Sequence, residues 1–499
     1  MKKQSEEQKS KILVAAPDKS QEGITAKRQE DFSEWFTQVL EKAELIDLRL
    51  DIKGFPVIRP WAAITIENMF KHLEKELQKK GHKPTFMPSV IPKENLTKES
   101  EHVKGFIPEV FWLKDIGDNK ELALRPTSET LYTPMFKLWV RSYRDLPLKL
   151  YQRGSVFRID TKATRPLIRG REFIWIECHD AFETREQAEA QVQEDIDTTE
   201  KVMHQIYGVP FLPMKRPEWD KFAGAEYTVG SDCFMPDGKL IQQPSTHLMG
   251  QKFSKAFNAT FKNKEEKEEY LWTTAYGPAI SRILASVIAT HGDDSGLVLP
   301  YSISPIQVII IPIFNAKNKN KILKKSKEIL NKLEKEDIKT EIDGREYKRP
   351  GEKYHIWELK GVPFRIELGE KELKKEEIIL FTRDIKKKEK LKLKDLKKIK
   401  EFGKEFDKRL REKADKFAEK RIVNCSNKKE IKETLSSGKI ARINFCSTDK
   451  AGIACAEIVE KEFSGDVRGT LANKNEKPGG NCLFCGKPAK EVVYIGRSY

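Results

Sequence analysis

The sequence predicts an α/β (α+β) protein of several domains, and three observations support this prediction. With 499 residues, the chain is long enough for about three domains that each bury a core. Segments with helical spacing of apolar residues alternate with short extended segments along most of the chain. The composition changes near the end, where residues 421–499 hold five of the seven cysteines. We therefore expect a large mixed core, a compact α/β domain and a small cysteine-containing C-terminal domain.

The composition excludes a disordered or membrane-spanning protein. Hydrophobic residues make up 38% of the chain and charged residues 34%, which is enough apolar material for a soluble globular fold. The longest apolar run, Val308–Phe314, is far shorter than the roughly 18 residues that a membrane span needs. The N-terminal residues Met1–Ser20 lack the features of a secretory or transit segment. We therefore expect a cytoplasmic protein.

The net charge of +16 favours a polyanionic partner, of which nucleic acid is the leading candidate. Lysines that only decorate solvated faces would give the same composition, and the composition alone does not separate these alternatives. Seven cysteines in a long cytosolic chain argue against a disulfide framework and make a metal site worth seeking.

The expected core begins with an amphipathic helix. Apolar residues from Trp61 to Leu77 follow i, i+3, i+4 spacing, and Gly81 is a natural stop. Residues 85–92 contain two prolines, which exclude a helix and suit an extended segment at a sheet edge. Further along we expect strands over 148–157 and 172–182, joined by a charged loop, and a long polar helix over 185–207.

The middle of the chain predicts a separate α/β domain. A buried strand over Ile306–Phe314 and a helix over Ile322–Leu333 precede strands over Val362–Leu368 and Ile378–Thr382. From Lys386 to Lys420, apolar residues at helical spacing in a lysine-rich segment predict a basic amphipathic helix that leads to the last domain.

Two arginines near the charged loop are candidates for phosphate binding. Arg158 follows the first expected strand and Arg169 precedes the second, so adjacent antiparallel strands would deliver both to a polyphosphate. Phe173, just beyond, is placed to stack on a base. Taken singly, each arginine is more often a surface or ion-pair residue, but the ordered set is far rarer.

Four cysteines near the C-terminus are candidate metal ligands. Cys482 and Cys485, followed by Gly486, form a knuckle that places two thiolates on one tetrahedral edge, and Cys446 and Cys455 would complete a structural zinc site. Eight residues separate Cys446 from Cys455, more than a usual knuckle has, so two buried thiols plus an incidental pair remain the alternative.

The ordered motifs resemble those of class II aminoacyl-tRNA synthetases, and the whole pattern resembles the prolyl-tRNA synthetase family of the archaeal and eukaryotic type. Residues 157–173 look like motif 2, Gly81–Pro88 like the dimer-forming motif 1, and Gly277–Arg282 with 291–300 like motif 3. Further family marks are Arg125-Pro126-Thr127-Ser128-Glu129-Thr130, residues 172–179, 350–363 and Gly496-Arg497-Ser498-Tyr499. The resemblance extends from about residue 25 to the last residue.

This resemblance implies a class II synthetase antiparallel β-sheet catalytic core flanked by helices over residues 25–301, after a polar N-terminal extension at 1–24. An α/β anticodon-binding domain would follow over 302–402, and a small zinc-binding C-terminal α+β domain over 403–499. The implied activity is that of a proline–tRNA ligase: a homodimer that uses L-proline, ATP with Mg²⁺, and tRNA(Pro).

The resemblance also implies site residues. A protonated imino acid has two N–H donors, which Thr127 and Glu129 would accept, although the same tripeptide is also typical of a helix cap. Alternation along a strand puts Trp175, Glu177 and His179 on one face. The proline pocket would comprise Thr127, Glu129, Arg158, Trp175, Glu177, His179 and His247, and the ATP site Arg158, Asp160, Arg169, Phe173, Gln242, Ser245 and Arg282, with Arg158 and Arg282 as catalytic residues. Without the family, the segment from Gln242 to Ser245 predicts a turn.

For the anticodon domain we expect contacts to a G-rich anticodon from Arg345, Arg349, Lys353 and Arg383, although each alone is more often a solvated charge. Two other functions stay open. One is a catalytically weak homologue that binds tRNA or prolyl-adenylate without charging, and the other is a class II synthetase for another amino acid. The elements around Thr127 and Trp175 favour proline, and the intact arginine set favours catalysis.

Overall fold

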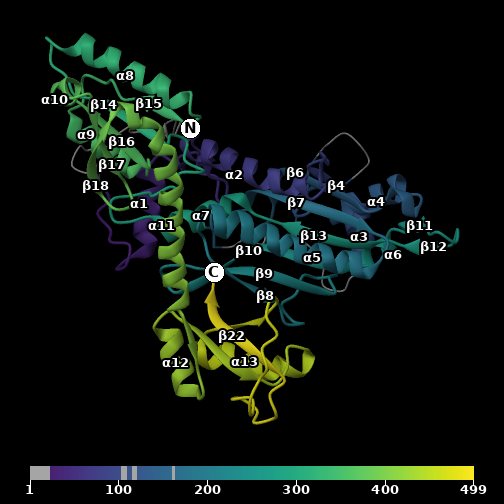
Figure 1. Cartoon of the computed structure of the whole chain (residues 1–499). Coiled ribbons are helices and arrows are strands. Elements are labelled where there is room, and N and C mark those ends of the chain that lie inside the picture. Colours follow the sequence, from purple (N-terminus) through teal and green to yellow (C-terminus); the bar gives the residue numbers. More distant parts are fainter. Residues whose placement is uncertain (1–22, 103–109, 115–120, 160–162) are drawn as a thin grey trace, which may run out of the picture.

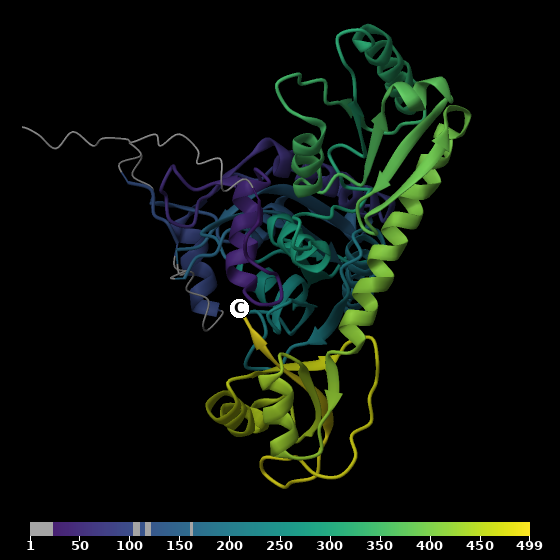
Figure 2. The same cartoon turned by 90° about the vertical axis from the view of Figure 1, so that its left-hand side faces the viewer.

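The computed structural model describes residues 23–102, 110–114, 121–159 and 163–499. The expected N-terminal extension therefore lies outside the described residues except for its last two. Figure 1 shows a central body with one lobe above it and another below, and Figure 2 shows the long helix α11 (Ile399–Glu419) running along one side from the upper lobe to the lower. Across the described ranges, no helix combines the length and apolar character that a membrane crossing requires.

The central body is built on an 11-stranded sheet. In spatial order its strands are β19 (Ile422–Asn424), β20 (Ile440–Phe445), β22 (Glu491–Ser498), β21 (Asp466–Leu471), β8 (Phe211–Lys215), β9 (Tyr227–Phe234), β10 (Lys239–Gly250), β13 (Trp272–Gly277), β7 (Glu172–Phe182), β6 (Leu148–Phe157) and β3 (Lys83–Pro84). Strands that are neighbours in this order run antiparallel except at the two ends of the sheet, and β22 makes an additional parallel pairing with β10. The expected strands 148–157 and 172–182 are thus confirmed, and the C-terminal strands extend the sheet of the core.

Helices cover one face of this sheet, and the period-2 alternation of the strands explains how. Along β7, Ile176 and Cys178 belong to the main apolar core, which α1 (Phe32–Lys42), α2 (Pro60–Lys79) and α7 (Ile280–His291) also build. Glu177, which lies between Ile176 and Cys178 on the strand, faces the other way and lines a cavity. The amphipathic helix expected at 61–77 is confirmed, and Gly81 follows it with a φ of +90°, which only glycine adopts readily.

Two expected elements differ in detail. The helix expected at 185–207 is α5 (Arg185–Thr199) continued by a π-helical segment over Glu200–Ile206. The extended segment 85–92 forms a strand at its C-terminal end, where β4 (Val90–Pro92) meets β5 (Leu122–Leu124), and at its other end the Thr85 N–H donates to the Tyr151 carbonyl at 2.8 Å.

The upper lobe contains a five-stranded sheet in the order β15 (Thr340–Ile342), β14 (Val308–Pro312), β16 (Phe364–Leu368), β17 (Glu377–Thr382) and β18 (Lys387–Lys392). Helices α8 (Lys319–Glu334) and α9 (Pro350–Leu359) belong to it. The expected α/β domain is therefore present. The helix expected from Lys386 was wrong in its first third: residues 387–392 form an edge strand, where exposed lysines are well tolerated, and α11 begins at Ile399.

Helix α11 joins two cores. Phe406 and Leu410 pack into the core of the upper lobe, and Ala418 packs against Leu240 and Tyr494 beside the lower one. The boundary expected between residues 402 and 403 therefore falls inside a continuous helix. The remaining strands and α-helices of the described residues are β1 (Ile46–Asp47), β2 (Val57–Ile58), α3 (Lys93–His102), α4 (Glu129–Trp139), α6 (Lys252–Ala256), β11 (Thr260–Lys262), β12 (Glu268–Tyr270), α10 (Glu370–Lys374), α12 (Lys428–Ser436) and α13 (Ile453–Phe463).

Candidate active site and metal centre

A cavity of about 610 Å³ opens on the opposite face of the central sheet from the one that α1, α2 and α7 cover. Strands β7, β10 and β13 supply much of its wall, and the rest comes from the start of α4 with the segment before it, Arg158, residues 220–222 and Thr228 of β9. The seven residues expected to form the proline pocket all line this one space: Thr127, Glu129, Arg158, Trp175, Glu177, His179 and His247. Residues from distant parts of the sequence thus share a single cavity.

Glu177 is held in the wall of this cavity by hydrogen bonds. Ser128 Oγ and Gln152 Nε2 both donate to its Oε1 at 2.6 Å, and His179 Nε2 lies 3.1 Å from its Oε2. Burial opposes ionisation of Glu177, but the hydrogen bonds from His179 and Ser128 and the charge on Arg125 outweigh it and lower the pKa of the carboxyl. Glu177 is therefore a fixed anion that orients its neighbours.

Glu129 is the carboxylate that the cavity presents beside a hydroxyl. The Thr127 hydroxyl donates to Glu129 Oε2 at 2.6 Å, and both side chains are buried and line the cavity. A ligand with two N–H donors would find a carboxylate and a hydroxyl oxygen side by side here. This geometry fits the expected role of the pair in binding a secondary ammonium group.

The pKa values of the two histidines of the cavity are shifted in opposite directions. Burial opposes protonation of His179, but Glu177 and Glu129 raise its pKa, and Tyr132 stacks on its ring at 4.4 Å between centroids. Burial, with the charges of His179 and Arg158, lowers the pKa of His247 to about 3. His247 is therefore neutral near pH 7, and its Nδ1 lies 2.8 Å from the Thr228 hydroxyl.

Trp175 forms an apolar wall. Its ring packs edge-on against Phe173, with 5.6 Å between centroids. A Cβ added to Gly277 would lie 3.0 Å from the Trp175 ring, so a larger residue there would crowd the wall. Among the described residues, the Trp175 indole N–H is buried without a hydrogen-bond partner.

Arginines gather around Phe173 at one end of the cavity. The guanidinium carbon of Arg158 lies 5.1 Å from the centre of the Phe173 ring, and that of Arg282 lies 6.0 Å from it. Arg282 donates to two backbone carbonyls, of Ile168 and Gln242, at 3.1 Å each. Burial, together with the positive charges of Arg158 and Arg169, lowers the pKa of Arg282 to about 10. The site therefore holds concentrated positive charge, which suits a polyphosphate.

A second cavity of about 320 Å³ adjoins the first and shares Arg158, Asp220 and Gln242 with it. The expected nucleotide residues Arg169, Phe173 and Arg282 line it, and Ser245 lines the first cavity. Asp160 lies outside the described residues. Three lining residues come from the C-terminal domain and were not expected as site residues: Arg468, Ser498 and Tyr499. No local pattern marks Arg468, since it reaches the cavity through strand pairing.

Strand β10 carries three of the site residues, Gln242, Ser245 and His247. The turn that Gln242 to Ser245 predicts by itself was wrong: the segment stays in the sheet, and the irregularity is a shift in its register with β9 between those two residues. Such a bulge changes the direction in which side chains point. Here it lets one strand serve both cavities.

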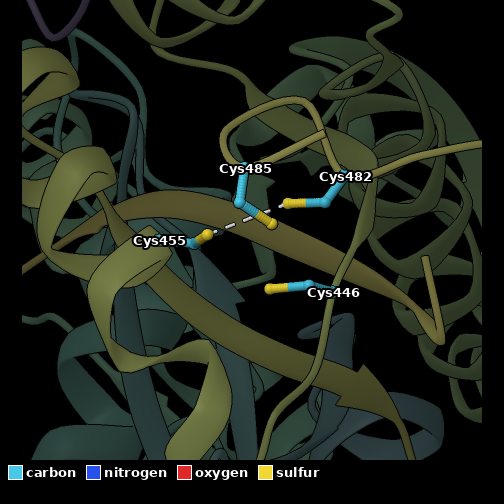
Figure 3. A group of neighbouring side chains, drawn as sticks. All are labelled: Cys446, Cys455, Cys482 and Cys485. Atoms are coloured by element: carbon cyan, nitrogen blue, oxygen red, sulfur yellow. Dashed lines mark hydrogen bonds between the residues drawn. The ribbon is translucent and has the colours of Figure 1, made fainter. Parts of the chain in front are cut away.

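The four C-terminal cysteines meet in space, as Figure 3 shows. Cys446 follows β20, Cys455 lies on α13, and Cys482 and Cys485 lie on the loop before β22. Their sulfur atoms all lie within 4.8 Å of one another, close to the about 3.8 Å that tetrahedral zinc–thiolate bonds of about 2.3 Å require. The Gly486 N–H donates to the Cys482 carbonyl at 3.0 Å, which closes the expected knuckle.

The four expected anticodon residues do not form one exposed set. Arg349 is exposed before α9, and Arg345 is half-buried with its guanidinium on Asp343 at 2.6 and 2.8 Å. Lys353 is buried and donates to the Asp343 carbonyl at 3.0 Å. Arg383 is fully buried.

The expected role of Arg383 as an anticodon contact does not fit its buried position. Its guanidinium donates to both carboxylate oxygens of Asp293, at 2.6 and 2.8 Å, and to the Glu358 carbonyl at 3.0 Å. These bonds join the upper lobe to the end of α7, so the side chain is committed to a domain contact. Tyr347, which lies between Arg345 and Arg349 in the sequence, was not expected; it is 80% exposed, so its ring face is open for stacking.

Three family models match the chain in order. The class II core domain of tRNA synthetases for G, H, P, S and T matches residues 111–291, an anticodon-binding domain matches 307–401, and the prolyl-tRNA synthetase C-terminal domain matches 428–499. The three matched ranges contain the main cavity, the five-stranded sheet and the cysteine cluster respectively.

Whole proteins are similar along nearly the full length. A proline–tRNA ligase of Thermofilum pendens is 47% identical, with 96% of this chain and all of that protein covered, and one of Methanopyrus kandleri is 39% identical over 94% and 96%. The structure of Giardia lamblia prolyl-tRNA synthetase with prolyl-adenylate superposes with a TM-score of 0.92 at 35% identity, covering 95% of this chain and all of that one. By sequence, domain content and fold, the chain belongs to the prolyl-tRNA synthetase family of class II aminoacyl-tRNA ligases.

Proposed function

We propose that this chain activates L-proline with ATP to form prolyl-adenylate and pyrophosphate, and then transfers proline to the 3′ end of tRNA(Pro). The observation that carries this proposal is the shared space between a pocket with an ammonium-binding end and an arginine cluster around Phe173. An amino acid held by Thr127 and Glu129 would extend its carboxylate toward Arg158.

The first step needs no general base, because the proline carboxylate is already ionised at neutral pH. It attacks the α-phosphorus, and the bond to the pyrophosphate leaving group breaks. Arg158 would neutralise charge at the α-phosphate, while Arg169 and Arg282 would hold the outer phosphates. ATP would enter as its Mg²⁺ complex, and the cation would offset part of the charge on the phosphates. The protein thus acts by positioning and by charge.

The upper lobe would bind the anticodon of tRNA(Pro). Arg349 and the half-buried Arg345 flank the exposed Tyr347 in the loop before α9, so a charged and an aromatic surface lie together. Because tRNA and ATP are cytoplasmic substrates, we place the enzyme in the cytoplasm. Substitution of Arg349 and Tyr347 together would raise the KM for tRNA but leave pyrophosphate exchange unchanged.

The functional unit would be a homodimer formed through the elements around α2. Exposed apolar side chains lie on the segment before α2, on α2 itself and just after β3, at Leu48, Leu50, Ile52, Val57, Ile64 and Phe86. A contiguous apolar patch made of these side chains would mark an association surface. Light scattering of Phe86→Asp would give a monomer, and a dimer of undiminished affinity would contradict this interface.

The cysteine cluster would hold a structural Zn²⁺. Four thiol groups gather in the C-terminal core, three of them buried, and burial raises the pKa of Cys446 to about 11. A bound divalent cation reverses this preference because it stabilises thiolates. With four protein ligands the metal would have no open position, so its contribution is to the fold of the C-terminal domain.

The decisive experiment is ATP–pyrophosphate exchange with the purified chain and each of the twenty amino acids. Exchange that depends on proline alone supports the proposal, and a following assay of prolyl-tRNA formation completes it. Exchange with another amino acid would overturn the choice of proline. No exchange in folded, zinc-loaded protein would favour a homologue that binds without charging, which the family relationship does not favour.

A further inference from the structure

The C-terminal domain lines the nucleotide cavity with Ser498, Tyr499 and the buried side chain of Arg468. Arg468 on β21 is 7% exposed and lines the second cavity together with Arg158, Gln242 and Arg282. Its strand pairs with β8 of the catalytic core, with Thr470 opposite Lys215. A Cβ added to Gly469 would lie 2.0 Å from the Lys215 carbonyl oxygen, so the close approach of the two strands depends on this glycine.

Arg468 grips a buried carboxylate of the core. Its Nε and Nη2 donate to the two oxygens of Asp232 at 2.8 and 3.0 Å. Both oxygens of Asp232 also accept hydrogen bonds from Arg216, at 2.9 and 2.5 Å. Arg216 Nη1 in addition donates to the Arg468 carbonyl at 3.0 Å. The side chains of Arg216 and Asp232 are fully buried. The three residues are therefore one rigid unit that spans two domains.

This unit ends on Gln242, which lines both cavities. Arg216 Nη2 donates to Gln242 Oε1 at 2.7 Å, and Arg282 holds the Gln242 backbone carbonyl at 3.1 Å. A guanidinium has only donors, so it can bond to the amide oxygen of Gln242 but not to the amide NH₂ group. The Gln242 N–H groups must then point away from Arg216, where they would donate to an acceptor on the ligand.

We propose that Arg468 is a positioning residue for adenylation, which fixes Arg216 through Asp232 so that Gln242 presents its amide donors to the nucleotide. The proposal rests on the proposed function, since it takes Gln242 as an ATP contact. Without Arg468, Asp232 keeps a single cationic partner, Arg216 moves toward it, and the Gln242 amide loses its fixed orientation. The C-terminal domain thereby acts on ATP binding, although no part of it carries out chemistry.

The test compares KM values for ATP and for proline in pyrophosphate exchange. We expect Arg468→Gln to raise the KM for ATP about tenfold, as for the loss of one hydrogen bond to a charged ligand, and to change the KM for proline less than about twofold. Arg468→Lys keeps the charge and would restore part of the loss. The matched control is Arg442→Gln, which breaks an arginine pair with Glu476 in the same domain, away from the cavity, and should leave both KM values unchanged.

Two further variants separate positioning from folding. Gln242→Glu keeps an acceptor for Arg216 but removes the amide donors, so it should weaken ATP binding in a protein that folds normally, even if Arg468→Gln does not fold. Addition of Arg468→Gln to Gln242→Ala should have no further effect on the KM for ATP. Additive effects, or equal rises in both KM values, would overturn the inference.

Failure of the proposal and failure of the proposed function give different results. If Gln242→Ala raises the KM for ATP but Arg468→Gln does not, the positioning role is wrong and the adenylation site stands. If Gln242→Ala leaves the KM for ATP unchanged, both the ATP contact and the positioning role are wrong. If the wild-type chain shows no proline-dependent exchange, the proposed function itself fails.

Discussion

Two arginines lie near opposite ends of helix α7, and their partners differ. Arg282, in its first turn, donates to the carbonyls of Ile168 and Gln242 and lies over the Phe173 ring. Arg383 reaches the other end, where it binds both carboxylate oxygens of Asp293. Both were expected to contact a substrate, but only Arg282 faces a cavity.

The difference shows that the kind of oxygen around an arginine decides what it can do. Carbonyl oxygens and ring faces orient a guanidinium but leave its full charge for a ligand, and nearby Arg158 and Arg169 add to that charge. A carboxylate cancels the charge and makes the arginine part of the fold. The cysteine cluster is the counterpart of the arginine site, because it gathers four metal-ligating sulfur atoms within 4.8 Å of one another.

The largest effect is expected for Arg282, the arginine that backbone carbonyls orient. Arg282→Ala should lower proline-dependent pyrophosphate exchange about 100- to 1,000-fold, because it removes a donor aimed at charge on the transferring phosphates. Arg158→Ala should do the same. The melting temperature should hardly fall, since burial beside two other cations already disfavours the charged form of Arg282. Exchange at the wild-type rate would refute the assignment.

The cysteine cluster provides the second test. Cys482→Ser should lose the bound zinc, about one per chain, and lower the melting temperature, while exchange per folded molecule falls far less than for Arg282→Ala. Metal content by mass spectrometry and calorimetry measure both. Cys425→Ser, a buried cysteine outside the cluster, is the control. Full zinc occupancy in Cys482→Ser would rule out the ligand set.

Substitution of Arg383, which pairs with the Asp293 carboxylate, should lower stability and leave catalysis nearly unchanged. Arg383→Met leaves Asp293 without its main cation and should cost about 3 kcal/mol of unfolding free energy, at the lower end for a broken buried pair because Asp293 is partly exposed. Denaturant unfolding measures this cost. Pyrophosphate exchange per folded molecule should stay near the wild-type value, and a 100-fold loss would mean that Arg383 acts on catalysis.

The smallest effect concerns pH. Burial opposes ionisation of Asp293, but the Arg383 hydrogen bonds outweigh it and lower the pKa of the carboxyl to about 2. Because this value is below the about 3.9 of an unfolded chain, the pair stabilises the fold above about pH 4, and the contribution is lost as the pH falls toward 2. Asp293→Asn should remove about 1–2 kcal/mol of that pH dependence in acid unfolding curves. An acid unfolding curve of Asp293→Asn identical to that of the wild-type chain would show that this pair does not contribute to the pH dependence of stability.

Local periodicity in the sequence determined much of this protein. The spacing from Trp61 to Leu77 predicted α2, and alternation predicted that Trp175, Glu177 and His179 share a face. The knuckle from Cys482 to Gly486 is also local, and its turn follows from neighbouring residues. These features depend on contacts within a few residues, where the helix and strand periods are fixed by backbone geometry.

Only the tertiary structure decided which side chains meet across long separations. Arg468 and Asp232 are 236 residues apart, and Arg383 and Asp293 are 90 apart, so no local pattern marks either pair. The pairing of β21 with β8 likewise joins two strands that lie far apart in the sequence. An arginine looks the same in the sequence whether it binds phosphate or a carboxylate, because its charge is free or cancelled only once the surrounding chain has packed.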